Sequence, residues 1–129
     1  MAHVIHIKAG SVEAIAELYT SKVAKVIWEV LPIKAKAETW GDEIYFPIPV
    51  YTELEAGSVN VKVGDLGYWP PGNAFCIFFG PTPISRKDEI RPASAVTVFG
   101  RIIGDARIFK NVKSGAEVVI SRHDESEKK

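Results

Sequence analysis

Short apolar or alternating segments, divided by glycine and proline, make up most of this sequence and restrict its fold more than any other feature. The strands expected after Pro32 are 34–40, 43–46, 75–79, 95–104 and 116–121, with a further apolar return at 61–66. Gly41, Gly64 and the run Pro70-Pro71-Gly72 supply the turns between them. About six to eight short strands with one helix predict a mainly β fold, a small closed β-barrel.

The N-terminal part carries the signal of a β-hairpin. Val4–Ile7 is apolar and β-branched, Gly10 supplies a turn, and 12–18 alternates apolar and polar residues. Glu13 and Ala14 are strong helix formers, so the propensity of 12–18 favours a helix instead. The alternation makes the paired strand our prediction.

One stretch has a helical period. Its apolar residues recur at steps of three and four, and they are Val23, Val26, Ile27, Val30 and Leu31. Thr20 or Ser21 is a suitable N-cap for a helix, and Pro32 prevents the helix from continuing. We therefore predict one helix from Thr20 to Leu31 that closes one opening of the barrel.

Length and charge exclude several classes of protein. The chain has 129 residues, which suits one domain over 1–122, followed by a charged tail over 123–129 that we expect to be disordered. Lys and Arg together number 16, as do Asp and Glu together, so the formal net charge is zero. Without a basic excess, a nucleic-acid partner is not expected. The N-terminus lacks the pattern of a signal peptide and no apolar run could span a bilayer. We expect a cytoplasmic protein with no membrane partner.

Residue usage also points to a habitat. Glutamine is absent, and asparagine appears only at Asn60, Asn73 and Asn111. Loss of thermolabile residues is typical of heat-adapted proteins, which predicts a thermophilic source.

Several motifs resemble those of the cyclophilin-like superfamily. The segment 11–23 is similar to the opening strand and helix entry of a cyclophilin, and 98–102 resembles its valine-phenylalanine-glycine-lysine-valine strand. Four further motifs, in one order, are similar to a minimal bacterial and archaeal cyclophilin-like family: 39–46, 64–72, 78–83 and 92–96. The resemblance implies a closed cyclophilin-like barrel over nearly all of the chain. That family has no established biochemical activity, so the fold leaves the function open.

Prolyl isomerisation is the first enzymatic hypothesis that the resemblance implies. Cyclophilins use an arginine at the prolyl amide, but 34–45 contains none, and Val96 stands where a histidine is expected. The chain also contains no glutamine that could hold the peptide. Arg86 and Arg91, in a nearby loop, are the arginines available to replace the missing one. Because such preorganised donors carry much of catalysis, we predict no efficient isomerase activity, with a divergent isomerase site as the alternative.

A binding site for a peptide segment or a small organic ligand is the hypothesis that we favour. Amphipathic aromatic and polar residues gather near rigid turns, and we predict that one pocket is lined by Trp40, Glu43, Tyr45, Tyr68, Trp69 and Thr82. The competing interpretation is that the rings fill the barrel, which we expect for Phe75 and Phe79.

The remaining candidates indicate no further chemistry. His3 and His6 would point to opposite faces of a strand, and Cys76 sits in an apolar run, so we expect no metal and no cofactor. The acidic pair Asp42-Glu43 is expected to be solvated, as acidic residues at turns usually are. A structural or oligomeric role stays open, with a homodimer formed through the edge of the first strand or through Trp69.

Overall fold

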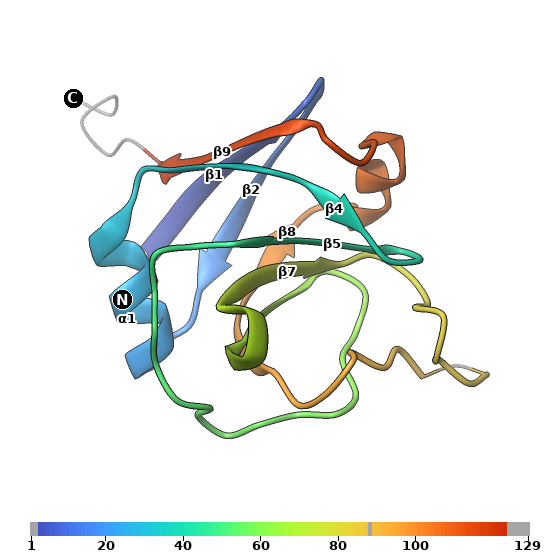
Figure 1. Cartoon of the computed structure of the whole chain (residues 1–129). Helices are drawn as coiled ribbons and strands as arrows, with labels where there is room; N and C mark the ends of the chain where they lie inside the picture. The colour runs from blue at the N-terminus through green and yellow to red at the C-terminus, as the bar shows by residue number, and fades with distance from the viewer. Residues whose placement is uncertain (1–2, 88, 124–129) are drawn as a thin grey trace.

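Nine strands form a single sheet that curls into a nearly closed barrel (Figure 1). The computed structural model describes residues 3–87 and 89–123. Along the chain the elements are β1 (His3–Ala9), β2 (Val12–Leu18), α1 (Lys22–Val30), β3 (Ile33–Lys36), β4 (Glu38–Thr39), β5 (Glu43–Pro47), β6 (Asp65–Trp69), the 3₁₀ turn η1 (Pro70–Gly72), β7 (Ala74–Phe78), β8 (Thr97–Ile103), the 3₁₀ turn η2 (Ala106–Asn111) and β9 (Glu117–Arg122). Within these residues α1 is the only α-helix, so the predicted mainly β barrel with one main helix is confirmed.

The two ends of the sheet meet at Ala37. The strand order is β3-β9-β1-β2-β8-β6-β7-β5-β4, and β3 and β4 at its two ends are consecutive in the chain. The Ala37 N–H donates to the Ala116 carbonyl at 2.8 Å, and the Ala37 carbonyl accepts from the Gly115 N–H at 2.7 Å. The single strand predicted over 34–40 is therefore two strands, because the chain crosses from one edge of the sheet to the other at this residue.

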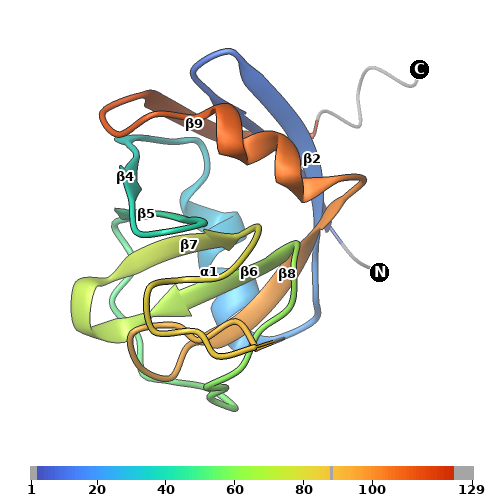
Figure 2. The same cartoon turned by 90° about the vertical axis from the view of Figure 1, so that its right-hand side faces the viewer.

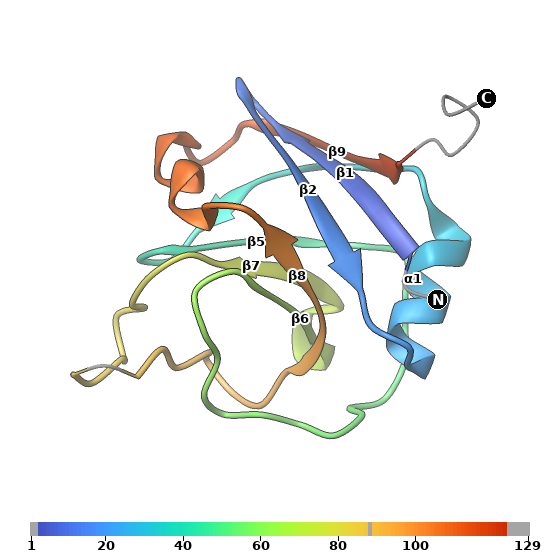
Figure 3. The same cartoon turned by 180° about the vertical axis from the view of Figure 1, so that it is seen from behind.

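The predicted opening hairpin is confirmed. β1 and β2 pair antiparallel from His3 opposite Leu18 to Ala9 opposite Val12, and Gly10 makes the turn with a φ of +58°. The alternation of 12–18 prevails over its helix propensity because one set of its side chains enters the core. β9 pairs with the other side of β1 (Figure 3), so the first strand has no open edge for a second copy.

The helix α1 covers one end of the barrel (Figures 1 and 3). Ser21 is its N-cap, and the Ser21 Oγ accepts a hydrogen bond from the Ala24 N–H at 3.1 Å. Glu55, from a distant loop, accepts from the two N–H groups at the start of α1 at 3.2 and 3.0 Å. Val23 and Ile27 are buried as predicted, whereas Val26 and Val30 are only half-buried, because the short helix turns a narrower face to the core.

The barrel has an apolar interior and a second apolar layer outside β5, β6 and β7. Side chains alternate along these strands, so Phe46 and Phe75 point inward while Cys76 and Phe78 point outward. The outer cluster consists of Val61, Ala74, Cys76, Phe78, Ile90 and Val96. The 80–96 loop, which here means residues 80–87 and 89–96, crosses the outer face of this part of the sheet (Figure 2) and supplies two members of the cluster.

Two smaller expectations concern the aromatic core and the tail. Phe75 and Phe79 are buried, as predicted. Pro47 ends β5 beyond the part that β4 covers, since β4 pairs only with Tyr45 and Ile44. The tail predicted over 123–129 lies outside the described residues except for His123. No helix in the described part combines the length and the apolar character required to cross a bilayer.

Candidate functional site

A pocket of about 270 Å³ opens on the outer face of the barrel, between the sheet and the 80–96 loop. Its lining residues are Trp40, Glu43, Tyr45, Trp69, Pro92, Ala93 and Val96. Four of the six residues predicted to share a site are in this set. Indole and phenol rings with proline, alanine and valine make the walls mainly apolar, and Glu43 is the one carboxyl group among them.

Strand geometry brings the predicted residues together. Glu43 and Tyr45 are two residues apart on β5, so both face outward, and Trp69 does the same at the end of β6. Trp40 lies in the tight turn before β5, which is closed by a hydrogen bond from the Trp40 N–H to the Glu43 carbonyl at 2.9 Å. The Asp42 N–H donates to the Pro81 carbonyl at 2.9 Å and ties this turn to the start of the 80–96 loop.

The indole of Trp69 is fixed in its orientation. Its Nε1–H donates to the Ser94 Oγ at 2.7 Å, so the ring hydrogen-bonds the loop across the pocket. Gly72 packs against the same ring, and a Cβ placed on Gly72 would lie 2.8 Å from the Trp69 Cζ3 atom. The turn of Pro70-Pro71-Gly72 therefore leaves the space that this indole needs.

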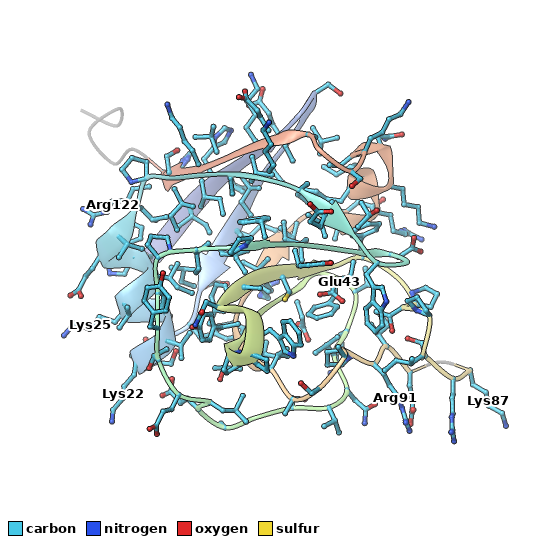
Figure 4. The ribbon with its side chains drawn as sticks, viewed as in Figure 1. Lys22, Lys25, Glu43, Lys87, Arg91 and Arg122 are labelled. Carbon is cyan, nitrogen blue, oxygen red and sulfur yellow. The ribbon has the colours of Figure 1, made fainter. Side chains whose placement is uncertain are left out.

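Glu43 is buried without a matching partner. Only 5% of the residue is exposed, and its Oε1 atom is buried with no hydrogen bond within the described residues. Figure 4 shows Glu43 on the side of the molecule away from α1, toward the 80–96 loop. The expectation that Asp42-Glu43 is solvated is wrong for Glu43, because β5 and the loop enclose its side chain. Buried carboxyl groups in proteins are normally paired, which makes this one a candidate binding group.

The environment changes the protonation of Glu43. Burial raises the pKa of its carboxyl to about 7, and the neighbouring Cys76 thiol opposes part of the rise. Burial, followed by the neighbouring Glu43 charge, raises the pKa of the Cys76 thiol well above its usual value. Cys76 is thus the buried residue that was predicted. It keeps its proton, and its thiol donates a weak hydrogen bond to the Ala74 carbonyl at 3.9 Å.

Tyr68 lies on the wrong face of the sheet for this pocket, contrary to the prediction. It precedes Trp69 on β6, so its side chain points inward, where it is 0% exposed. The Tyr68 hydroxyl donates to the Val50 carbonyl at 2.6 Å and accepts from the Asn73 amide at 3.2 Å. For Tyr68 the barrel-filling interpretation is correct.

Thr82 is also absent from the lining, and it organises the loop instead. Its hydroxyl donates to the Arg91 carbonyl, which joins the two arms of the 80–96 loop. The Ser85 Oγ accepts from the N–H of Thr82 at 2.9 Å and from the N–H of Arg91 at 3.0 Å. The side chain of Arg91 pairs with Glu89 at 2.9 Å, and Figure 4 shows Arg91 at the edge of the molecule, apart from Glu43.

Sequence reasoning missed the far wall of the pocket. Pro92, Ala93 and Val96 contribute that wall, although 92–96 is one of the motifs on which the resemblance rests. Nothing in their residue types indicated a binding role, because small apolar residues are common in every core and loop. Their order within a shared motif was the available signal.

The histidines do not assemble a metal site. The His3 ring stacks on Trp28 with 3.9 Å between ring centroids, and the His6 Nε2 atom lies 2.9 Å from the Glu13 carboxylate. Over residues 3–87 and 89–123 no three His, Cys, Asp or Glu side chains group as metal ligands would.

Comparisons with known proteins agree with this geometry. A family model described as cyclophilin-like matches residues 3–121. The solution structure of a hypothetical protein from Archaeoglobus fulgidus is similar, with 44% identity over 94% of this chain and 95% of that chain and a TM-score of 0.79. No curated protein matches the chain. The barrel and the extent of the family match show that the chain belongs to the cyclophilin-like family.

Proposed function

We propose that this protein binds a small organic ligand or a peptide segment in the outer-face pocket and does not isomerise prolyl bonds efficiently. The observation that carries the proposal is Glu43, a buried carboxyl with an unpartnered oxygen in a pocket otherwise walled by rings and small apolar groups. Ligand sites commonly have this composition, with apolar walls and a few polar groups that orient the ligand.

The size of the pocket limits the ligand. Its volume of about 270 Å³ lies just below the range of roughly 300–1,000 Å³ usual for small-molecule sites. A single ring with a short substituent, or one side chain of a peptide, suits this space. Fixed surroundings support binding further, since a ring such as Trp69 that is already oriented loses little entropy when a ligand arrives.

The polar groups of the pocket favour binding over prolyl isomerisation. An isomerase must stabilise a prolyl amide that has lost its double-bond character, against a barrier of about 18–20 kcal/mol. Among the described residues that line the pocket there is no Arg, Lys, His or Gln, and the Trp69 N–H already donates to Ser94. Arg91 is paired with Glu89 and is not among the lining residues.

The three tryptophans make a direct test of binding. Trp40 and Trp69 line the pocket, whereas Trp28 stacks with His3 elsewhere. A library of small metabolites and proline-containing peptides is first screened for a ligand that changes the tryptophan fluorescence of the parent protein. In the control variant Trp28→Phe, that ligand should cause the same change. Trp40→Phe and Trp69→Phe should each reduce that change and weaken affinity by roughly tenfold, because ring contact is lost. An unchanged response in both pocket variants would contradict the proposal.

Isomerase activity is tested separately with a protease-coupled assay on proline tetrapeptides. We expect rates close to the uncatalysed background, because the pocket offers no strong donor to the prolyl amide. Acceleration like that of an authentic cyclophilin would support the divergent isomerase instead, and Arg91→Ala would then identify whether that guanidinium takes part.

A further inference from the structure

The unpartnered carboxyl of Glu43 defines the chemistry of what the pocket accepts. A carboxyl oxygen needs a hydrogen-bond donor, and an ionised carboxylate in an apolar pocket also needs a positive charge. The described residues that line the pocket provide no cation. Either the Glu43 carboxyl stays protonated, or a bound ligand supplies the positive charge that the carboxylate needs.

We propose that the pocket binds a small organic cation, a protonated amine on a hydrocarbon ring or chain, with its ammonium group at the Glu43 carboxyl and its hydrocarbon part between Trp40 and Trp69. This inference rests on the proposed binding function and names its ligand class. The shared chemistry is an ammonium next to an apolar group, which a free amine and the amino-terminus of a peptide both offer.

The aromatic walls suit such a ligand. Cations are attracted to the faces of aromatic rings, and tryptophan is the best of them. Because the Trp69 N–H is used by Ser94, this ring presents carbon rather than a competing donor to the pocket. An anionic ligand is disfavoured, since it would face a carboxyl group with no Lys or Arg among the described lining residues.

The surroundings of Glu43 leave room for one positive charge. The titratable groups near its carboxyl are the Cys76 thiol on β7 and the Tyr45 phenol on β5. Charged side chains on the adjoining turn and loop form ion pairs with other residues. The Asp42 Oδ2 atom lies 3.8 Å from the Lys110 Nζ atom, and the Arg91 Nε atom lies 2.9 Å from the Glu89 Oε1 atom. A carboxyl group also rotates about a soft, roughly two-fold torsion, so either oxygen can meet the ammonium group.

Proton exchange gives the inference a signature. With a pKa of about 7, most of the free protein holds Glu43 protonated below neutral pH. A cation binds the ionised form, so binding must release that proton and affinity must rise with pH. At pH 6.5 roughly three quarters of a proton leaves per cation bound, and at pH 5.5 affinity is about 30-fold lower than at pH 8.

The experiment is isothermal titration calorimetry with benzylamine and its neutral isostere benzyl alcohol, at pH 5.5, 6.5 and 8, in buffers of different ionisation enthalpy. We expect benzylamine to bind at least tenfold more tightly than benzyl alcohol at pH 8, with the proton release stated above. Glu43→Gln should abolish both the preference and the proton release. Glu38→Gln removes an exposed carboxylate of the neighbouring β4 and should change neither.

Separate outcomes distinguish the two proposals. Equal binding of both probes, or binding of benzylamine without proton release, overturns the cation inference and leaves the binding function standing. Failure of both probes together with every member of the ligand library overturns both proposals. If benzyl alcohol binds as tightly as benzylamine and Trp69→Phe weakens that binding, the ligand is neutral. This result overturns the cation inference.

A last arm identifies the source of the amine. Phenylalanylglycine amide with a free amino-terminus is compared with its N-acetylated form. Tighter binding of the free peptide than of benzylamine assigns the pocket to peptide amino-termini, and tighter binding of benzylamine assigns it to free amines. Equal binding of the free and the acetylated peptide counts against an ammonium ligand.

Discussion

At the residue scale, Glu43 links the stability of the protein to the binding that we propose for the pocket. The residue is 5% exposed, and burial raises the pKa of its carboxyl from the usual 4.5 to about 7. Between pH 4.5 and about 7, the folded protein therefore keeps a proton on Glu43 that the unfolded chain has released. If the pocket binds a ligand as proposed, this group is kept at a cost to the stability of the fold at neutral pH.

The expected pH dependence follows from the sign of that shift. Because the pKa of Glu43 is higher in the folded state, its contribution to stability is fully present below about pH 4.5 and is lost as pH rises through about 7. The loss is about 3 kcal/mol for a shift of this size. Denaturant unfolding of the parent and of Glu43→Gln from pH 4.5 to 8 measures it. The difference in unfolding free energy between them should change over this window, and a constant difference would contradict the assignment.

At the element scale, the 80–96 loop is a wall of the pocket held by side chain to backbone hydrogen bonds. Thr82 and Ser85 join its two arms, and Val96 packs in the outer cluster. The residue types of the loop, mostly polar with several prolines, gave no sign of these bonds, because they depend on which backbone groups meet after folding.

Thr82→Val tests whether the loop shapes the site. Loss of the hydroxyl leaves the partly buried Arg91 carbonyl without its donor, so we expect about 1–2 kcal/mol of destabilisation and weaker ligand binding. Amide hydrogen exchange at Ser85 and Arg91 should accelerate while exchange in β1 stays slow. Thr20→Val, at an exposed threonine beside α1, serves as the control. Equal effects of the two variants on binding would show that Thr82 does not organise the pocket.

The helix α1 offers a second element-scale test. Ile27 is 0% exposed and lies in the inner core, so Ile27→Ala should cost about 2–5 kcal/mol. Val26→Ala, on the half-buried neighbour, should cost clearly less, because fewer contacts are lost. Thermal and denaturant unfolding compare the two. Similar losses would mean that the buried face of α1 is placed incorrectly.

At the scale of the whole molecule, the sequence predicted the barrel and its hairpin but only part of the site. Turn residues and periodicity were enough for most of the strands, since both signals are local. They did not show that 34–40 divides at Ala37, or that the strand expected over 61–66 is β6 at Asp65–Trp69. Whether a ring faces in or out depends on strand register, so the sequence did not show that Trp69 faces the pocket while Tyr68, one residue earlier, faces the core. The far wall of the pocket at Pro92 and Ala93 requires contacts between distant segments, which a single sequence does not reveal.

Circular permutation tests the closure of the barrel at Ala37. The His123 N–H donates to the Val4 carbonyl at 2.9 Å, so a short linker can join the ends of the described chain. New termini in the exposed loop at Glu53 and Leu54 should leave a folded, binding protein. New termini at Ala37 should strongly destabilise it, because both sheet ends depend on that residue. Circular dichroism and thermal unfolding compare the permutants, and equal stability would contradict this role of Ala37.

The position of β9 between β1 and β3 also sets the order in which the molecule can be completed. A ribosome makes the chain from its N-terminus, so β9 is the last of these strands to emerge. Until then both of its neighbours carry a row of unsatisfied backbone groups, the kind of surface that chaperones cover and that aggregation exploits. We therefore expect the nascent protein to remain an open sheet until β9 pairs with β1 and β3 and completes the barrel.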